Sequence, residues 1–224
     1  MTKVWRVGSE ADDRLASLGL AAEDFAVSIE AAVSDARTCT GLDAPSARSF
    51  IFWTRLNRYF REAVKPREWG ATNADQILRA LSPNRDFAIT AVSGRGGIAD
   101  PNGKVRTKNP KGSAFAELIK VNNRLLGRYV QGDLLPGLRL VREEPSREPG
   151  VQDIPLWILL YRRVGEELCA ELSLPTDIKC KSVEDWEERV MLASTPYPGD
   201  VDSLDIFRYD EDDDQGPDIA VDWL

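Results

Sequence analysis

The apolar residues of this 224-residue chain change their spacing along the sequence, and this change limits the folds available to it. Between Ala22 and Arg37 they recur every three or four residues, as they do on one face of an α-helix. From residue 87 onward they occur in short runs with β-branched residues, which is typical of strands. Helices followed by strands predict the α+β class, with a helical N-terminal half over residues 1–82.

Three helices are predicted in this N-terminal half. The first covers Ala22–Arg37, and the second begins with Asp43 as its N-cap and ends before Pro66. A short third helix covers Asn73–Leu81, where a Ser-Pro pair follows.

The centre of the chain is predicted to form a strand, a glycine-rich loop and a helix. Phe87–Val92 are predicted to be the strand, and the turn Asp100–Gly103 returns the chain as a hairpin over Lys104–Thr107. The helix begins with Ser113 as its N-cap.

Beyond residue 136 the pattern predicts an antiparallel hairpin sheet, one helix and an acidic tail. The predicted strands are Leu138–Val141, a run buried on both faces at Leu156–Tyr161, and a half-buried strand at Leu168–Leu174. The last helix begins at Ser182 and contains Trp186 and Val190. We predict one domain over residues 1–195, mixed over 83–195, and a flexible acidic tail over 196–224.

The chain has no histidine, which excludes Ser-His-Asp and Cys-His nucleophile pairs, zinc sites built on histidine and HNH-type nucleases. Cys39, Cys169 and Cys180 lie far apart in sequence, so we predict reduced thiols and no metal site. No apolar run approaches the roughly 20 residues that cross a bilayer. We therefore expect a cytoplasmic protein that does not bind a membrane.

Charge is unevenly distributed along the chain. The formal net charge is −8, yet residues 81–130 contain 9 basic and 3 acidic side chains, whereas residues 131–224 contain 9 and 23. Cations near glycines and a helix N-terminus are the combination that phosphates require. The predicted nucleic-acid contacts in this segment are Arg95, Lys104, Arg106, Lys108, Lys111, Lys120, Arg124 and Arg128. The alternative is a hairpin loop followed by a solvated helix face, and neither a Walker A motif nor a dinucleotide fingerprint is present.

The second predicted helix has arginines on one side. Arg48, Arg55 and Arg58 would extend the basic surface, and Trp53 and Tyr59 would stack on bases. The alternative is a polar face above an apolar core stripe.

An enzymatic alternative depends on carboxylates. Glu171, Asp177 and Lys179 include a D-x-K triplet after a predicted hairpin, which is similar to part of the PD-(D/E)xK nuclease pattern. That resemblance implies Mg²⁺ held by the acids and a lysine that helps to activate water. The sequence departs from the pattern because Asp153 precedes the first strand of the hairpin and Pro175 precedes the triplet, so we assign no family.

The acidic tail is a candidate docking segment. Its predicted partner-binding residues are Asp212, Asp213, Asp214, Trp223 and Leu224. Alternatively, the tail folds over the basic centre and competes with nucleic acid, or it only increases solubility.

Together these features predict a non-enzymatic subunit of a larger assembly. It would contact nucleic acid or another polyanion through its centre and a protein partner through its tail, without a cofactor. Such a subunit also fits a bacterial defence-type complex with an antiviral role. The alternatives are a Mg²⁺-dependent nuclease, for which magnesium would be the one cofactor, and a purely structural protein-protein interaction subunit.

Overall fold

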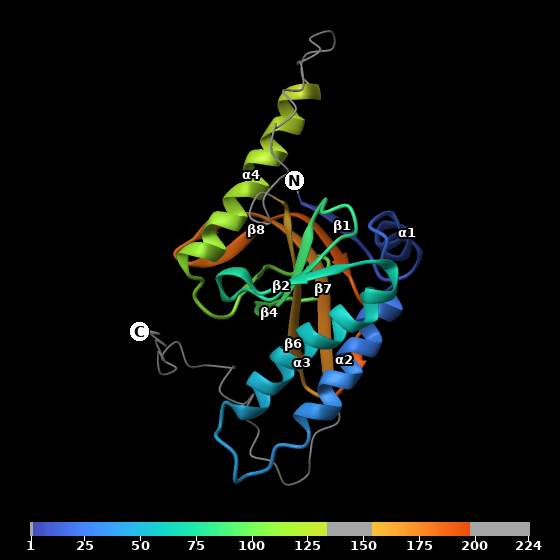
Figure 1. Cartoon of the computed structure of the whole chain (residues 1–224), viewed down its shortest axis with the longest axis vertical. Helices are drawn as coiled ribbons and strands as arrows, with labels where there is room; N and C mark the ends of the chain where they lie inside the picture. The colour runs from blue at the N-terminus through green and yellow to red at the C-terminus, as the bar shows by residue number, and fades with distance from the viewer. Residues whose placement is uncertain (1, 134–153, 198–224) are drawn as a thin grey trace.

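The computed structural model describes residues 2–133 and 154–197, and it confirms the α+β class (Figure 1). The helices are α1 (Ser9–Ser17), α2 (Ala22–Ala36), α3 (Ala47–Val64) and α4 (Ser113–Asp133). The strands are β1 (Lys3–Trp5), β2 (Gly70–Thr72), β3 (Arg79–Leu81), β4 (Ala88–Gly96), β5 (Val105–Thr107), β6 (Leu156–Val164), β7 (Glu167–Lys179), β8 (Ser182–Met191) and β9 (Thr195–Pro196). Two 3-10 turns cover Lys65–Arg67 and Ala74–Gln76.

All of these strands belong to one mixed sheet. Its order is β1-β8-β7-β6-β4-β3-β2, with β5 paired to the C-terminal end of β4 and β9 paired to the start of β7. β4 runs parallel to β6 and β1 runs parallel to β8, while the other pairs are antiparallel. The sheet therefore connects strands from both ends of the described chain.

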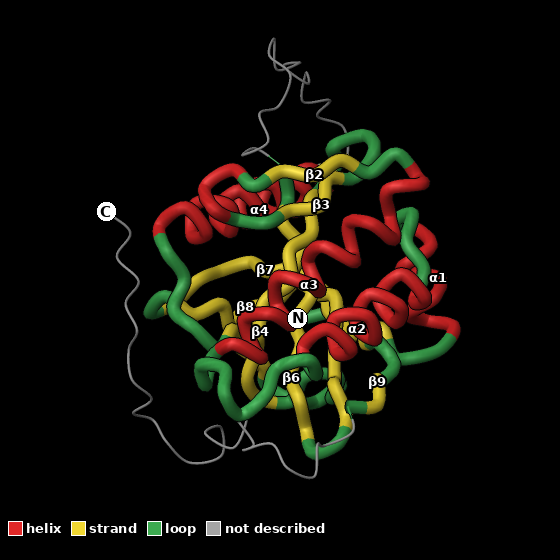
Figure 2. The backbone as a smooth tube through the Cα atoms, turned by 60° about the horizontal axis from the view of Figure 1, so that its bottom comes forward, coloured by secondary structure: helices red, strands yellow, loops and turns green. Residues whose placement is uncertain are grey.

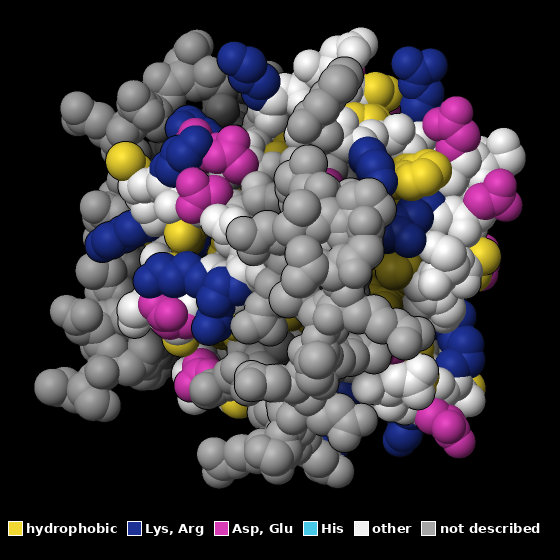
Figure 3. Space-filling view, turned by 90° about the horizontal axis from the view of Figure 1, so that it is seen from above, with side chains coloured by type: hydrophobic (Ala, Val, Ile, Leu, Met, Phe, Trp, Pro, Cys, Tyr) yellow, Lys and Arg dark blue, Asp and Glu magenta, His cyan; other side chains and the backbone are white. Residues whose placement is uncertain are grey.

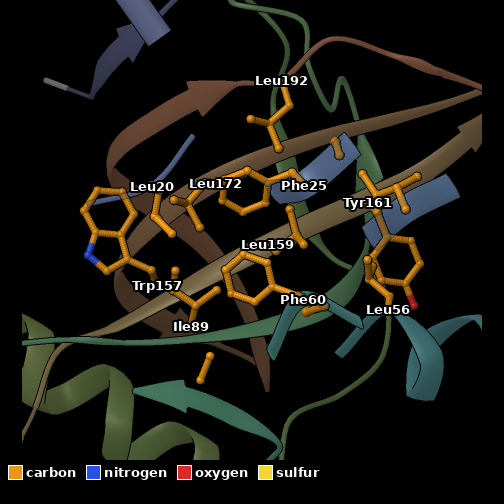
Figure 4. Close-up of a cluster of buried hydrophobic side chains, with 14 of the residues drawn as sticks. Leu20, Phe25, Leu56, Phe60, Ile89, Trp157, Leu159, Tyr161, Leu172 and Leu192 are labelled. Carbon is orange, nitrogen blue, oxygen red and sulfur yellow. The ribbon is translucent and has the colours of Figure 1, made fainter. Parts of the chain in front are cut away.

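Helices α2 and α3 lie side by side over one face of the sheet (Figures 1 and 2). The apolar stripe predicted for α2 is buried there, including Phe25 and Ile29. Phe25 stacks on Phe60 of α3 with ring centroids 5.1 Å apart. These rings lie among Leu159 and Leu172 from the sheet (Figure 4). Because each fully buried side chain of this size contributes about 1.5–3 kcal/mol, this layer is a major source of stability.

Helix α4 covers a second cluster of buried side chains on the sheet. Phe115, Leu118 and Ile119 belong to this cluster, which also contains Leu156 and other strand residues. A buried amide fixes the helix position, because Asn122 donates to the carbonyl oxygens of Leu156 and Pro175, each at 2.8 Å. The same side chain accepts a 2.8 Å bond from the Leu156 amide.

The sheet is split on the edge of β4 that faces away from β6. β3 pairs with Ala88 and Ile89, and β5 pairs only from Gly94 onward. Between them a side chain of α3 replaces a strand, since the Ala91 amide donates to Asn57 Oδ1 at 3.0 Å. Trp53 Nε1 donates to the Ala91 carbonyl oxygen, also at 3.0 Å. The split leaves room for a cavity beside β4.

Several elements follow the sequence-based prediction and others correct it. The strand at residues 87–92, its return over 104–107, the helix from Ser113 and the hairpin of β6 and β7 are confirmed. The helix predicted over Asn73–Leu81 is wrong: Asp75 and Gln76 have positive φ of 56° and 59°, which ends the turn, and β3 follows. The second helix begins at Ala47 instead of near Asp43. The strand predicted at 138–141 lies outside the described residues.

The helix predicted from Ser182 is also wrong, because this segment is strand β8. Trp186 and Val190 are four residues apart, a spacing compatible with a helix and also a multiple of the strand period. Cys180 and Lys181 form a tight turn with φ of 48° and 64°, which returns β8 onto β7. The half-buried pattern predicted for β7 is wrong as well, since both Glu171 and Ser173 are fully buried.

Candidate nucleic-acid interface

The glycine-rich segment forms the connection between β4 and β5. Gly97 and Gly103 lie against each other, because a Cβ on either one would come within 2.6 Å of the other's Cα. The amides of Gly97, Asp100 and Gly103 all donate to carbonyl oxygens within the hairpin. These glycines therefore allow close packing, and their N–H groups are not directed at a ligand as the sequence had suggested.

A buried ion pair fixes this hairpin to the sheet. Arg189 of β8 and Glu171 of β7 lie 2.6 Å apart with side chains 5% and 0% exposed. The Arg189 guanidinium also donates to the carbonyl oxygens of Gly97, Asp100 and Gly103 at 3.2, 3.2 and 2.8 Å. Breaking a buried pair costs about 3–5 kcal/mol, so these two charges have a structural role.

Cations surround a hollow beside the hairpin. Arg95 and Arg106 lie directly opposite each other across β4 and β5, so their side chains emerge on the same face. Together with Arg6 and Lys104 they line a hollow of about 1000 Å³. We call this the hairpin hollow. The structure thus brings together three of the predicted basic residues and adds Arg6.

The hairpin hollow also contains two carboxylates that have partners. Glu184 lies 4.0 Å from Arg106, and Asp185 lies 2.6 Å from Lys179. Within residues 2–133 and 154–197, no ion pair involves the side chain of Arg6, Arg95 or Lys104. The hairpin hollow therefore has a local excess of positive charge.

The sequence alone did not indicate Arg6. This residue follows β1, and the parallel pairing of β1 with β8 places it beside the hairpin. β1 has only three residues, and its partner lies at the other end of the described chain. No local pattern marks such a contact.

The basic row of α4 lies apart from the hairpin hollow. Lys120 and Arg124 are exposed, but neither lines the hollow, and Lys120 pairs with Glu117 at 2.6 Å. The side chain of Arg128 lies outside the described part of the structure. On the face seen in Figure 3, the visible dark-blue cations are interspersed with magenta acids. Lys108 and Lys111 line a different cavity, beside the split in the sheet.

The arginines of α3 all have partners. Arg48 is 6% exposed and donates to the Cys39 carbonyl oxygen at 3.0 Å. Arg55 pairs with Asp35 at 2.9 Å, and Arg58 pairs with Glu62 at 2.8 Å, which raises the pKa of the Arg58 guanidinium. Of the two aromatic residues proposed to stack on bases, Trp53 bonds to β4 and Tyr59 donates to Asp35. This arrangement resembles a polar face over a core more than a separate binding surface.

Glu171 lies apart from Asp177 and Lys179, the other two residues of the nuclease alternative. Glu171 is fully buried against Arg189, and Asp177 lies six positions further along β7, about 20 Å away at roughly 3.3 Å per residue. Lys179 bonds to Asp185, which raises the pKa of the Lys179 ammonium. Among the described residues there is no group of three or more Asp, Glu, Cys or His side chains that could hold a metal ion.

The predicted partner-binding residues of the acidic tail, Asp212, Asp213, Asp214, Trp223 and Leu224, lie outside the described residues. Within the described part, no helix is both long and apolar enough to cross a lipid bilayer.

Comparison with known proteins found no relative of this chain. No protein-family model, no curated protein and no solved structure matches this chain.

Proposed function

We propose that this chain is a non-enzymatic subunit of a larger assembly that binds nucleic acid through the hairpin of β4 and β5. The observation that carries this proposal is the pair Arg95 and Arg106, which face each other across the two strands beside Arg6 and Lys104. Like charges directly opposite each other destabilise a strand pair. A bound phosphate backbone would offset that repulsion, so the arrangement favours a polyanion as ligand.

Phosphate contact is the expected mode of binding. Arg6, Lys104 and Arg106 are exposed on flexible side chains, and such cations position a nucleic acid without reading its bases. The chain as a whole has a net charge of −8, so attraction is confined to the surroundings of the hairpin hollow. Salt should therefore weaken binding strongly.

The proposal is tested by fluorescence anisotropy with labelled 20-mers of double-stranded DNA, single-stranded DNA and RNA. We expect at least one of them to bind with a slope of log K against log salt of about −3, as three to four phosphate contacts require. Arg95→Gln combined with Arg106→Gln should lower affinity about tenfold or more and reduce the slope by roughly 2, because two contacts are lost.

A matched variant removes the same charge from α4. Lys120→Gln combined with Arg124→Gln should leave binding within about twofold of wild type, because neither residue lines the hairpin hollow. The proposal fails if no nucleic acid binds at low salt, if binding does not depend on salt, or if the α4 variant loses as much affinity as the hairpin variant.

A further inference from the structure

A second cavity lies where β4 is left uncovered between β3 and β5. Its volume is about 590 Å³, within the range of roughly 300–1000 Å³ usual for small-molecule sites. Its walls come from the start of α3, residues 76–78, residues 90–93 of β4, and the segment that connects β5 to α4, together with Phe115 and Tyr161. We call it the split cavity. It does not share a lining residue with the hairpin hollow.

The charged residues of the split cavity are all cations. Lys108 and Lys111 line it together with Asn109 and the serines Ser46 and Ser49, and none of its described lining residues is acidic. Lys111 Nζ lies 5.7 Å from the centroid of the Phe115 ring. No carboxylate among the described residues forms an ion pair with Lys111. A cavity with these groups favours an anion.

An aromatic pair forms one wall of the same cavity. Phe50 is 61% exposed, and its ring centroid lies 5.8 Å from that of Trp53, with an angle of 50° between the two ring planes. The Trp53 indole is held in place by its 3.0 Å bond to the Ala91 carbonyl oxygen. A fixed indole beside an exposed phenyl ring offers a surface on which a planar ring can stack.

We propose that the split cavity binds a small organic anion of the nucleotide class. The planar base would lie against Phe50 and Trp53, and the phosphate would lie near Lys111 and Lys108. Hydroxyl groups of Ser46 and Ser49 lie in the same lining and can bond to a sugar or a phosphate. Neither the aromatic pair nor the lysines alone selects this class, but their combination in one cavity does. This site is independent of the nucleic-acid surface proposed above.

Isothermal titration calorimetry of the full chain with AMP, GMP, CMP and UMP tests the proposal. We expect at least one nucleotide to bind with a Kd of about 1 mM or lower. Its nucleoside and ribose 5-phosphate should each bind about tenfold more weakly, because each lacks one half of the recognised chemistry. During the titration the backbone amide NMR signals of Ala91 and Asn109 should shift.

Two substitutions separate the two halves of the site. Lys111→Met should lower nucleotide affinity about tenfold or more, since a charged hydrogen bond is lost while the apolar stem is retained. Phe50→Ala should lower affinity about fivefold or more through loss of stacking, and its exposure makes damage to the fold small. Circular dichroism checks that both variants are folded.

Two control variants lie in the hairpin hollow. They are Lys104→Met and the double variant Arg95→Gln with Arg106→Gln. Both should leave nucleotide affinity unchanged. Conversely, Lys111→Met should leave the binding of oligonucleotides unchanged. The proposal is overturned if none of the four nucleotides binds at concentrations up to about 10 mM. It is also overturned if folded Lys111→Met binds as tightly as wild type, or if the hairpin variants lose the nucleotide equally.

Discussion

Lys111 is partly buried, and it forms no ion pair with a carboxylate of the described residues. Burial lowers the pKa of this ammonium from 10.5 to about 8. The other charged or titratable side chains that line the same cavity are Lys108 and Tyr161. Burial raises the pKa of the Tyr161 hydroxyl, so Tyr161 stays neutral near pH 8. The positive charge at Lys111 therefore costs stability when the cavity is empty, and a bound anion would offset this cost.

Replacing Lys111 with Met should stabilise the protein. At 1.36 kcal/mol per pKa unit, the fall from 10.5 to about 8 corresponds to about 3 kcal/mol. Because solvent reaches part of this side chain, we expect a smaller gain at pH 7, about 2 kcal/mol in the free energy of unfolding. Between pH 8 and 10.5 Lys111 keeps its proton in the unfolded chain but has lost it in the folded protein, so the wild type gains stability as the pH rises. The difference in the free energy of unfolding between Lys111→Met and wild type therefore becomes smaller. Urea denaturation at pH 7 and pH 10 measures this trend. Lys104→Met, at an exposed lysine, should change stability by less than about 0.5 kcal/mol at both pH values, and a destabilised Lys111→Met variant would contradict the argument.

The sequence identified the basic and acidic residues but not the groups to which they bond. Arg48 was predicted to be a surface contact, yet it is buried and bonds to the Cys39 carbonyl oxygen. Glu171 was a candidate metal ligand, yet it is paired with Arg189, eighteen residues away in sequence. Charge and spacing describe one side chain at a time, whereas a partner depends on strand pairings that bring distant residues together.

The split edge of β4 depends on one side-chain amide of helix α3, that of Asn57. Asn57 accepts a bond from the Ala91 amide, and its own amide donates to the Trp53 carbonyl oxygen at 2.9 Å. A helix side chain thus replaces a strand at the position where β3 has ended and β5 has not begun. The Asn57 side chain thereby keeps the split cavity open, because a continuous strand would occupy that edge of β4.

Asn57→Leu should therefore destabilise the protein by about 1–3 kcal/mol, because it leaves the buried Ala91 amide without an acceptor. Hydrogen exchange followed by NMR should show a selective loss of protection at the Ala91 amide, and urea denaturation gives the free energy. Asn123→Leu, on the exposed side of α4, is the matched control and should change stability by less than about 0.5 kcal/mol. Unchanged exchange at Ala91 in the Asn57 variant would show that the amide is not needed there.

Element types were predictable where a pattern is long or its turn chemistry is familiar. The stripe of α2 and the hairpin turn at Asp100–Gly103 are examples, and both are observed. β8 was missed because the turn before it places Cys180 and Lys181 at positive φ, positions where Asn and Gly are the usual signal. The basic centre was predicted, but its division between the hairpin hollow and the split cavity depends on β3 and β5 sharing one edge of β4.

For the molecule as a whole, the sheet joins the two ends of the described chain. β1 pairs with β8, and Glu188 of β8 binds both Trp5 Nε1 at 3.0 Å and Arg14 Nε at 2.8 Å. β4 pairs with β6, although the segment between them includes α4. The helices of the N-terminal half pack on strands from the C-terminal half, with Phe52 of α3 in edge contact with Tyr161 of β6. Neither half can bury its apolar surface without the other.

This interdependence predicts one cooperative unfolding transition. In a urea titration, far-UV circular dichroism reports mainly α2, α3 and α4. Tryptophan fluorescence reports side-chain packing, because the described tryptophans include Trp157 and Trp186 in the sheet, Trp53 on α3 and Trp69 against Phe60 of α3. The two curves should coincide within error, because loss of the sheet exposes the apolar faces of the helices at the same moment. Glu188→Gln is an informative second sample, since weakening the attachment of β1 should shift both curves to lower urea together. Separate midpoints would instead mean that the helical half folds on its own, and the division at residue 82 would then mark a boundary between two domains.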